Sequence, residues 1–218
     1  SLIITTINKP NHNMRMYDKG CKKNKWNFIV VGDKKTPKKF KLSHAKFINY
    51  KKKIDDISFS EKCPINTYAR KNIGYLQAIK NNSEVIVETD DDNSPLKNFF
   101  IPFSLYSESQ IIHKNNEWIN IYNYFVDKKY IDKIWPRGLP LDKIKKDNNE
   151  KIIKKGKKKN LVIQSLCNGN PDVDAIYRLM NPKIENFKFI KDKKFFISKK
   201  SYVPFNSQST IWYSDAFP

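Results

Sequence analysis

Residues 85–92 are Val85-Ile86-Val87-Glu88-Thr89-Asp90-Asp91-Asp92, an apolar run that ends in three consecutive aspartates. The β-branched residues predict a strand, and the acids after it belong to a loop. Ligands of open α/β sheets bind beyond the carboxyl ends of the strands. Carboxylates at that edge are hard oxygen ligands suited to Mg²⁺ or Mn²⁺, and adjacent acids repel one another without a cation, which raises a pKa. We predict a metal site here; the alternative is an acidic surface turn.

The segments before this run predict an α/β unit over residues 1–100. Apolar runs at Leu2–Ile7 and Trp26–Val31 predict two strands, and Met14–Lys23 between them predicts a crossover helix. This order indicates a parallel pair. Helical spacing predicts another helix over Thr67–Asn81, which leads directly into a third strand, Glu84–Thr89. We expect a nucleotide-binding type of sheet.

Residues 101–218 are less regular, and we interpret the whole chain, 1–218, as a single domain of two halves. Asp142–Lys159 holds nine lysines and predicts a solvated loop or a frayed helix. The other segments of this half with a predicted structure are a strand-like Trp118–Phe125, a rigid turn Trp135–Pro140, a strand Leu161–Ser165, a short helix Asp172–Met180 and a mixed segment Tyr202–Trp212.

The net charge of +20 suggests nucleic acid as a partner, but the kind of basic residue argues against it. Arg is the preferred residue for bidentate phosphate and base contacts, and only four of the 42 basic residues are Arg. The lysine excess is spread over most segments, as a codon bias of an AT-rich genome would produce. We expect no specific nucleic acid, and a nucleic-acid-binding protein remains the alternative.

Cysteine usage and hydropathy indicate the compartment. Three widely spaced cysteines without a CxxC pair predict neither a disulfide framework nor a zinc site. No apolar run reaches the roughly 18–20 residues that span a bilayer, and the N-terminus has no signal-peptide pattern. We expect a cytoplasmic protein with no membrane span in this chain. Because the chain opens at Ser1, the alternative that an upstream membrane anchor was trimmed off is left open.

Two further groups of residues are candidates for the same edge of the sheet. Gly32-Asp33 follows a strand and permits close backbone approach, with one carboxylate for a base N–H or ribose hydroxyls, while Thr5-Thr6-Ile7-Asn8 would supply hydroxyl and amide groups beside it. Arg70 and Lys71 stand in the first turn of a helix, where basic residues oppose the helix dipole. A diphosphate would explain them. Solvation is the simpler explanation for Lys71.

Two aspartates in the second half of the chain are candidates for a general base. If the reaction inverts, a carboxylate must take the proton of an acceptor hydroxyl, and Asp172 and Asp174 are the candidates. Asp172 also suits a helix N-cap, so we prefer Asp174 as the base. A retaining reaction would need no such base.

Seven stretches of this chain, in this order, resemble the STELLO family of glycosyltransferases. The resemblance covers nearly the whole chain and departs from the family in Asp142–Lys159. The matching stretches are Ile4–Asn8, Val30–Pro37, Asn66–Leu76, Glu88–Asn93, Trp135–Pro140, Gly169–Leu179 and Pro204–Thr210.

The resemblance implies a GT-A-like fold, with a Rossmann-type sheet, helices on both faces and a mixed acceptor-side half. It implies a DxD motif formed by Asp90 and Asp92, with Asp92 as the direct ligand of Mn²⁺ or Mg²⁺, a UDP- or GDP-sugar donor, and a glycan or other hydroxyl acceptor. Asp33 would lie at the base or ribose. Plant members studied are Golgi membrane proteins, so the Golgi lumen is the alternative location if an anchor was removed. The residues expected to bind the nucleotide sugar are Thr5, Thr6, Asn8, Asp33, Lys34, Arg70, Asn72, Asp90 and Asp91.

Two other enzyme-related interpretations compete with metal-dependent glycosyl transfer. A nucleotidyltransferase also uses paired acids and metal, but it would show a Gly-rich phosphate loop after the first strand, and Asn8-Lys9-Pro10-Asn11 is not one. A catalytically inactive scaffold is the other, and the retained acid triplet argues against it.

Overall fold

The computed structural model describes residues 1–51, 54, 58–101, 104–145, 151–182, 187–190 and 193–217, without the side chain of Lys154. The chain divides into two compact units. Unit 1 comprises Ser1–Phe103, Leu161–Ile163 and Ser207–Pro218, and unit 2 comprises Ser104–Asn160 and Gln164–Asn206. Each unit is described by itself.

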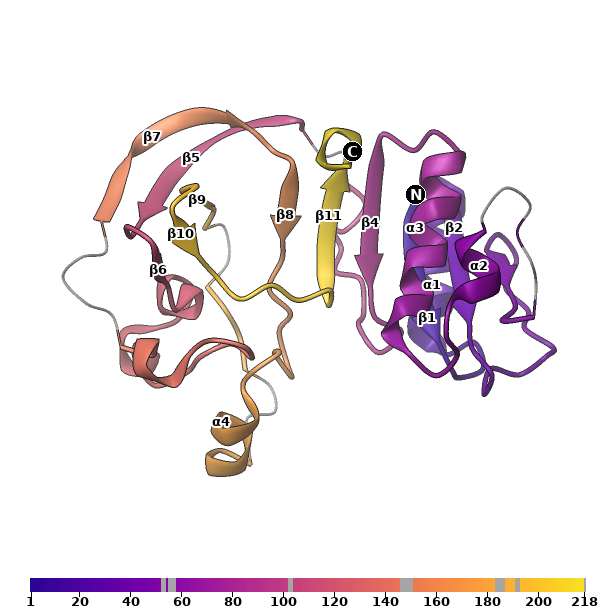
Figure 1. Cartoon of the computed structure of the whole chain (residues 1–218), viewed down its shortest axis with the longest axis horizontal. Helices are drawn as coiled ribbons and strands as arrows, with labels where there is room; N and C mark the ends of the chain where they lie inside the picture. The colour runs from indigo at the N-terminus through magenta and orange to yellow at the C-terminus, as the bar shows by residue number, and fades with distance from the viewer. Residues whose placement is uncertain are drawn as a thin grey trace. The chain divides into compact units, whose positions relative to one another are not determined.

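A six-stranded sheet forms the centre of unit 1 (Figure 1). The strands are parallel from β3 to β4, whereas β11 runs antiparallel to β4. The pairing of Thr6 with Gly32 brings the carboxyl ends of β1 and β2 to one edge, and the parallel β4 ends at that edge too. The strand order is β3 (Lys46–Ile48), β2 (Phe28–Gly32), β1 (Leu2–Thr6), β4 (Val85–Thr89), β11 (Ser209–Tyr213) and β8 (Val162–Gln164).

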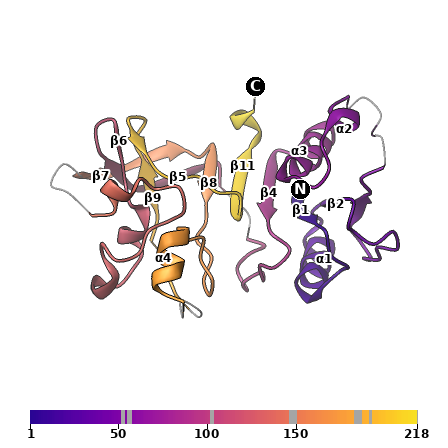
Figure 2. The ribbon, with the colours of Figure 1, turned by 60° about the horizontal axis from the view of Figure 1, so that its bottom comes forward.

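Helices cover both faces of the parallel strands (Figure 2). Helix α1 (His12–Asn24) lies on one face, and its first turn is capped by Asn11, whose side chain accepts from the Met14 N–H. Helices α3 (Lys71–Lys80) and α2 (Phe59–Lys62) lie on the other face, and the single turn η1 (Tyr68–Arg70) precedes α3.

Alternate strand residues form an apolar core on the face of the sheet that α3 covers. Ile3, Ile29 and Val31 are buried in one cluster with Ile73 of α3. Helix α3 packs closely there because Gly74 has no side chain: an added Cβ would lie 2.5 Å from Cγ2 of Ile3. The predicted strands, the crossover helix, the parallel pair and the α/β class with helices on both faces are therefore confirmed, and the arrangement is compatible with a GT-A-like fold.

Unit 2 contains two small sheets and its own apolar cluster. One sheet has the order β7 (Lys151–Lys159), β5 (Tyr106–His113), β9 (Phe195–Ile197), and the other pairs β10 (Ser201–Tyr202) with β6 (Glu117–Trp118). The helix α4 (Ala175–Met180) carries Tyr177 into the cluster. The remaining 3₁₀ turns are η2 (Ile121–Tyr124), η3 (Lys128–Tyr130), η4 (Leu141–Lys143) and, in unit 1, η5 (Ser214–Ala216).

The secondary structure predicted for two segments of the second half is wrong. Trp118–Phe125 is not a strand beyond Trp118: it turns into η2, where Asn120 donates to the carbonyls of Ile134 and Ile144 and Tyr122 packs into the cluster of unit 2. These tertiary contacts override the β propensity of the aromatic residues.

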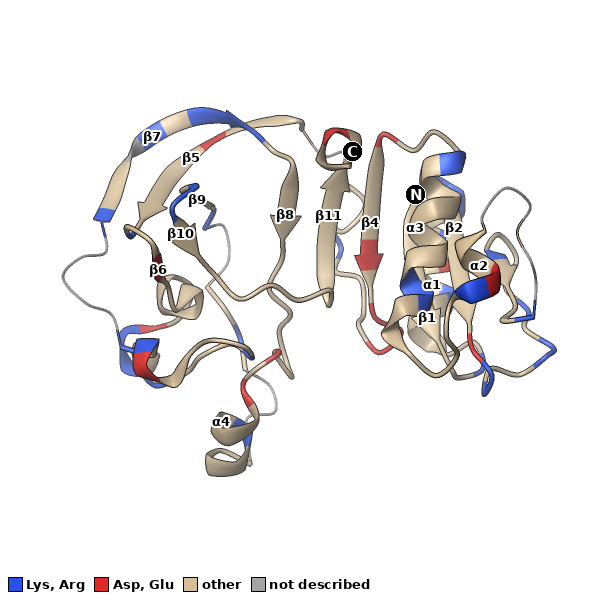
Figure 3. Ribbon diagram, viewed as in Figure 1, with Lys and Arg blue, Asp and Glu red and all other residues tan. Residues whose placement is uncertain are grey.

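The Lys-rich segment is the second correction. Lys151–Lys159 forms strand β7, antiparallel to β5, and not a loop or a frayed helix. Lysine is common on exposed edge strands because it discourages further pairing, so a lysine-rich composition does not exclude a strand. Figure 3 shows the basic residues along β7. Residues 146–150 of the predicted loop lie outside the described residues.

Among the described residues, no helix is both long and apolar enough to cross a membrane.

Candidate functional site

The three aspartates lie at the carboxyl edge of the sheet in unit 1, directly after β4, where Figure 3 shows a concentration of acidic residues. Each of them has a different environment. Asp91 is bound to the end of β1: its Oδ2 accepts from Oγ1 of Thr6 and, at 3.1 Å, from Nδ2 of Asn8. Asn11 also donates to the Asp91 carbonyl at 2.7 Å. The structure therefore brings together three predicted site residues, Thr6, Asn8 and Asp91. Thr6 and Asn8 hold the loop of the three aspartates, the acid loop, in place.

Asp90 is half-buried, and one of its oxygens is bound to a lysine. Nζ of Lys71 donates to Oδ1 of Asp90 at 3.0 Å, while Oδ2 has no hydrogen-bond donor within the described part of the chain. Burial raises the pKa of Asp90 most, the Lys71 ammonium lowers it, and Asp92 and Asp91 raise it further. The predicted rise of an acid pKa is confirmed, although burial contributes more than repulsion between the aspartates.

Asp92 is the most exposed of the three. Its backbone is fixed, because Nδ2 of Asn13 donates to the Asp92 carbonyl at 2.9 Å. Its carboxylate makes no hydrogen bond or ion pair with any residue that the structure describes. The edge thus presents two available acceptors, Oδ2 of Asp90 and the carboxylate of Asp92.

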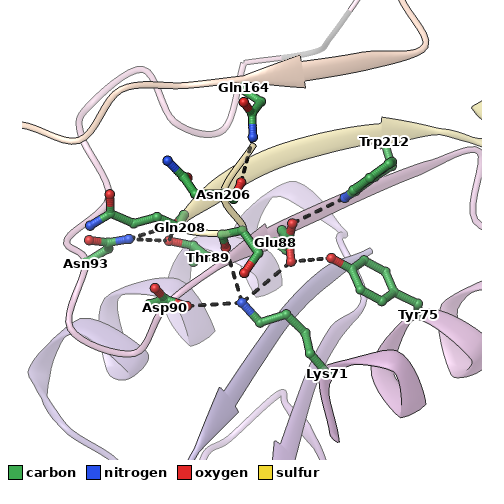
Figure 4. Close-up of polar contacts among 11 residues, drawn as sticks. Lys71, Tyr75, Glu88, Thr89, Asp90, Asn93, Gln164, Asn206, Gln208 and Trp212 are labelled. Carbon is green, nitrogen blue, oxygen red and sulfur yellow. Dashed lines mark hydrogen bonds and ion pairs between the residues drawn. The ribbon is translucent and has the colours of Figure 1, made fainter. Parts of the chain in front are cut away.

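A buried polar network lies behind Asp90 (Figure 4). Glu88 is fully buried in β4, and its carboxylate accepts from the Tyr75 hydroxyl and, at 3.3 Å, from Nε1 of Trp212. Nζ of Lys71 lies 3.5 Å from Oε2 of the same carboxylate. Burial and the neighbouring Glu88 raise the pKa of Tyr75, so this hydroxyl stays a proton donor.

The start of β11 is fixed to the same edge through its backbone. Lys71 donates to the Ser207 carbonyl at 3.2 Å. The Gln208 carbonyl accepts from Oγ1 of Thr89 at 3.1 Å and from Nδ2 of Asn93 at 2.8 Å (Figure 4). Strand β4, the acid loop and the C-terminal strand therefore form one hydrogen-bonded edge.

The end of β2 supplies the next group of predicted residues. Asp33 is buried, and its N–H donates to Oγ1 of Thr36, whose hydroxyl donates in turn to the Thr6 carbonyl at 2.6 Å. The Lys34 N–H donates to Oδ1 of Asp33 at 2.6 Å, while the Lys34 side chain is exposed. The structure thus brings Asp33 to the edge formed by Thr6 and Asp91.

Arg70 lies behind the end of β2. Only 3% of it is exposed, and its Nη2 lies 3.4 Å from the Gly32 carbonyl. Its Nε has no hydrogen-bond partner in the described structure. Thr5 is half-buried and Asn72 is exposed, and neither side chain hydrogen-bonds to another described residue.

The solvated role suggested for Lys71 is wrong. Lys71 is 4% exposed and lies between two carboxylates, which compensate a basic residue in the first turn of α3. Sequence reasoning also gave no role to Glu88, Tyr75 or Trp212. The available signal was Glu88 itself, since an acid inside an apolar strand needs a buried partner.

The predicted base candidates lie in unit 2, and the residue that caps the helix there is not the one predicted. Asp174, not Asp172, caps α4: its Oδ1 accepts from the Ile176 N–H at 2.8 Å. Asp172 forms an ion pair with Arg137, 2.5 Å from Nη2 to Oδ1. The expected N-cap at Asp172 is wrong because α4 begins at Ala175, three residues later.

The three aspartates Asp90, Asp91 and Asp92 at the carboxyl edge of the sheet are called the acid edge. Their chemistry fits a divalent cation in part. Oxygen donors are available from Asp90 and Asp92, and Mg²⁺ or Mn²⁺ takes one or two carboxylates and completes its shell with substrate phosphates and water. No set of three or more His, Cys, Asp or Glu residues arranged to hold a metal occurs among the described residues. The protein alone thus offers an incomplete shell.

Comparison with known proteins identifies relatives in a plant. The chain is 28% identical over 215 residues to "Probable glycosyltransferase STELLO2" and 27% identical over 215 residues to "Probable glycosyltransferase STELLO1", both from Arabidopsis thaliana. The chain is a relative of the STELLO proteins. The similarity covers 88% of this chain and 27% of each STELLO protein, so the chain spans about a quarter of their length. No protein-family model matches the chain.

Proposed function

We propose that this chain is a glycosyltransferase domain that moves a sugar from a nucleoside-diphosphate sugar to a hydroxyl acceptor with the help of Mn²⁺ or Mg²⁺. The observation that carries the proposal is the pair of available acceptors, Oδ2 of Asp90 and the carboxylate of Asp92, at the carboxyl edge of the parallel strands. The names of the STELLO relatives support glycosyl transfer as the reaction. The proposals for the sugar donor and for the metal rest on the chemistry of the residues at this edge.

In the proposed complex, Asp92 and the free oxygen of Asp90 would hold the cation. When bound, a divalent cation stabilises the negative charge that develops on the departing nucleoside diphosphate. Asp91 is already occupied by Thr6 and Asn8, so its role would be to keep the loop in the conformation that presents its two neighbours.

The end of β2 would receive the nucleoside. The buried carboxylate of Asp33 would accept from the base or the ribose hydroxyls, with Thr5 and Asn8 on the neighbouring strand. Arg70 would act from behind by holding the Gly32 carbonyl, and the exposed Lys34 and Asn72 would contact the nucleotide from the surface.

The acceptor-side base stays a proposal. Asp174 is our candidate for taking the acceptor proton if the reaction inverts. Its Oδ1 caps α4, so only the other oxygen would be available for this purpose.

The experiment is a thermal-shift screen of nucleotide sugars with and without Mn²⁺. Stabilisation by one UDP- or GDP-sugar that depends on Mn²⁺ is the expected result, because a ligand that binds only the folded state raises its stability. No response to any nucleotide sugar, together with salt-dependent binding to DNA, would instead favour the nucleic-acid alternative. Metal-dependent binding without transfer to any acceptor would favour an inactive scaffold.

A further inference from the structure

The contact between Lys71 and Asp90 is the feature that the proposed function does not explain. A lysine ammonium that binds a metal-ligand carboxylate competes with the cation for that carboxylate. Lys71 is also held firmly, because its Nζ lies within reach of Asp90, Glu88 and the Ser207 carbonyl. The position of Lys71 therefore affects the affinity of the acid edge for a cation.

Glu88 is the reason that Lys71 stays in place. Its carboxylate is fully buried, and a buried charge is strongly unfavourable unless a partner compensates it. Tyr75 and Trp212 supply neutral hydrogen bonds to this carboxylate, but Lys71 is its cation. Lys71 is thus anchored from behind by Glu88, whether or not a ligand is bound in front.

The consequence concerns Asp90. With its Oδ1 bound to Lys71 at 3.0 Å, Asp90 offers one oxygen, and the ammonium beside it repels a second cation. The Asp92 carboxylate has no such restraint. The acid edge of the free protein is therefore a weaker cation site than three aspartates suggest.

We infer that Lys71 is a positioning residue that keeps the acid edge from binding a divalent cation tightly until a nucleotide diphosphate supplies further oxygen ligands and negative charge. Metal and nucleotide would then bind together, each strengthening the other. Such mutual strengthening is a coupling free energy between two ligands, and it is equal in both directions. This inference rests on the proposed function, because it assumes that Asp90 and Asp92 face the diphosphate.

The test removes the lysine without leaving a buried charge behind. Lys71→Met alone would leave Glu88 uncompensated, so the informative variant is the double substitution Lys71→Met with Glu88→Gln. The glutamine can still accept from Trp212 and bond to the Tyr75 hydroxyl. The matched control is Lys80→Met with Glu84→Gln, which makes the same two changes at exposed positions near the other end of α3. Thermal unfolding without ligand checks that both double variants fold.

Mn²⁺ binding is then measured by isothermal titration, first with Mn²⁺ alone and then with Mn²⁺ in the presence of UDP or of GDP. We expect the Lys71/Glu88 double variant to bind Mn²⁺ alone about tenfold more tightly than the wild type, because the ammonium 3.0 Å from Asp90 is gone and Oδ1 of Asp90 is released. The gain in Mn²⁺ affinity on adding UDP or GDP should shrink correspondingly. The control should behave like the wild type. A gain of affinity is decisive because damage to the fold would cause a loss.

The outcomes separate the two proposals. If the folded Lys71/Glu88 double variant binds Mn²⁺ alone no more tightly than the wild type, the inference is overturned while the proposed function stands. If Mn²⁺ strengthens the binding of neither UDP nor GDP to the wild type, the metal-dependent function is overturned and the inference with it.

Discussion

The chain has two acidic segments of similar appearance, Asp90-Asp91-Asp92 in unit 1 and Asp172-Val173-Asp174 in unit 2, and their environments differ. In the second segment, both carboxylates have a local structural role: one pairs with Arg137 and the other caps α4. In the first, Thr6 and Asn8 hold the Asp91 carboxylate and Lys71 holds one oxygen of Asp90, whereas the Asp92 carboxylate has no partner within the described structure. Asp90 and Asp92 keep oxygens without partners among the described residues, beside a buried cation. An acidic cluster indicates a ligand site when it has more carboxylate oxygens than the fold itself binds.

The largest expected effect is the loss of stability when Lys71, the cation beside Asp90, is replaced. Lys71→Met should lower the free energy of unfolding by about 3–5 kcal/mol, because it leaves the fully buried Glu88 without a cation. Urea unfolding measures the loss. Adding Glu88→Gln should recover most of it, and Lys80→Met, an exposed lysine of the same helix, should change stability by less than about 0.5 kcal/mol. A Lys71→Met protein as stable as the wild type would contradict the role of Lys71 as the cation that compensates Glu88.

An intermediate effect is expected at Asp174, where structural and chemical roles can be separated. Asp174→Asn should abolish transfer while leaving nucleotide affinity nearly unchanged, because asparagine caps a helix as well as aspartate but cannot accept a proton. Transfer assays and nucleotide titration measure the two quantities.

The matched variant Asp174→Ala removes the cap as well and should cost about 1 kcal/mol of stability. Unchanged turnover in Asp174→Asn would remove this residue from the mechanism and leave it as a cap only.

The smallest effect concerns pH. Because the pKa of Asp90 is raised in the folded protein, the folded state binds more protons than the unfolded state in the range just above the ordinary value of 3.8. Stability from this group is therefore present at low pH and is lost as pH rises through that range. Asp90→Asn should flatten this part of the profile in urea unfolding without ligand. A profile that keeps its slope in the variant would assign the effect to another group.

The sequence predicted four strands of the sheet of unit 1, namely β1, β2, β4 and β8, because their evidence is local, whereas β3 and β11 were not predicted. Apolar runs such as Leu2–Ile7 and the helical spacing within Thr67–Asn81 predict strands and helices without knowledge of the rest of the chain. The meeting of Thr6, Asp33 and Asp91 at one edge then follows from the parallel order of the strands.

The missing part of the prediction depends on tertiary contacts. Lys71 was interpreted as solvated because its partner Glu88 is 17 positions away, and only the packing of α3 against the sheet brings the two together. The same holds for Trp212 of β11, which reaches Glu88 from the end of the chain. β7 was missed because lysine composition indicates solvent exposure but not whether a partner strand such as β5 is present.

The central claim is that Asp90 and Asp92 bind a divalent cation together with a nucleotide diphosphate. The most direct test is isothermal titration of UDP and GDP, with and without Mn²⁺, into the wild type and Asp92→Asn. We expect Mn²⁺ to strengthen the binding of one of the two nucleotides to the wild type by about tenfold or more, and Asp92→Asn to lose this gain. Nucleotide binding that ignores Mn²⁺, or an equal gain in Asp92→Asn, would contradict the claim.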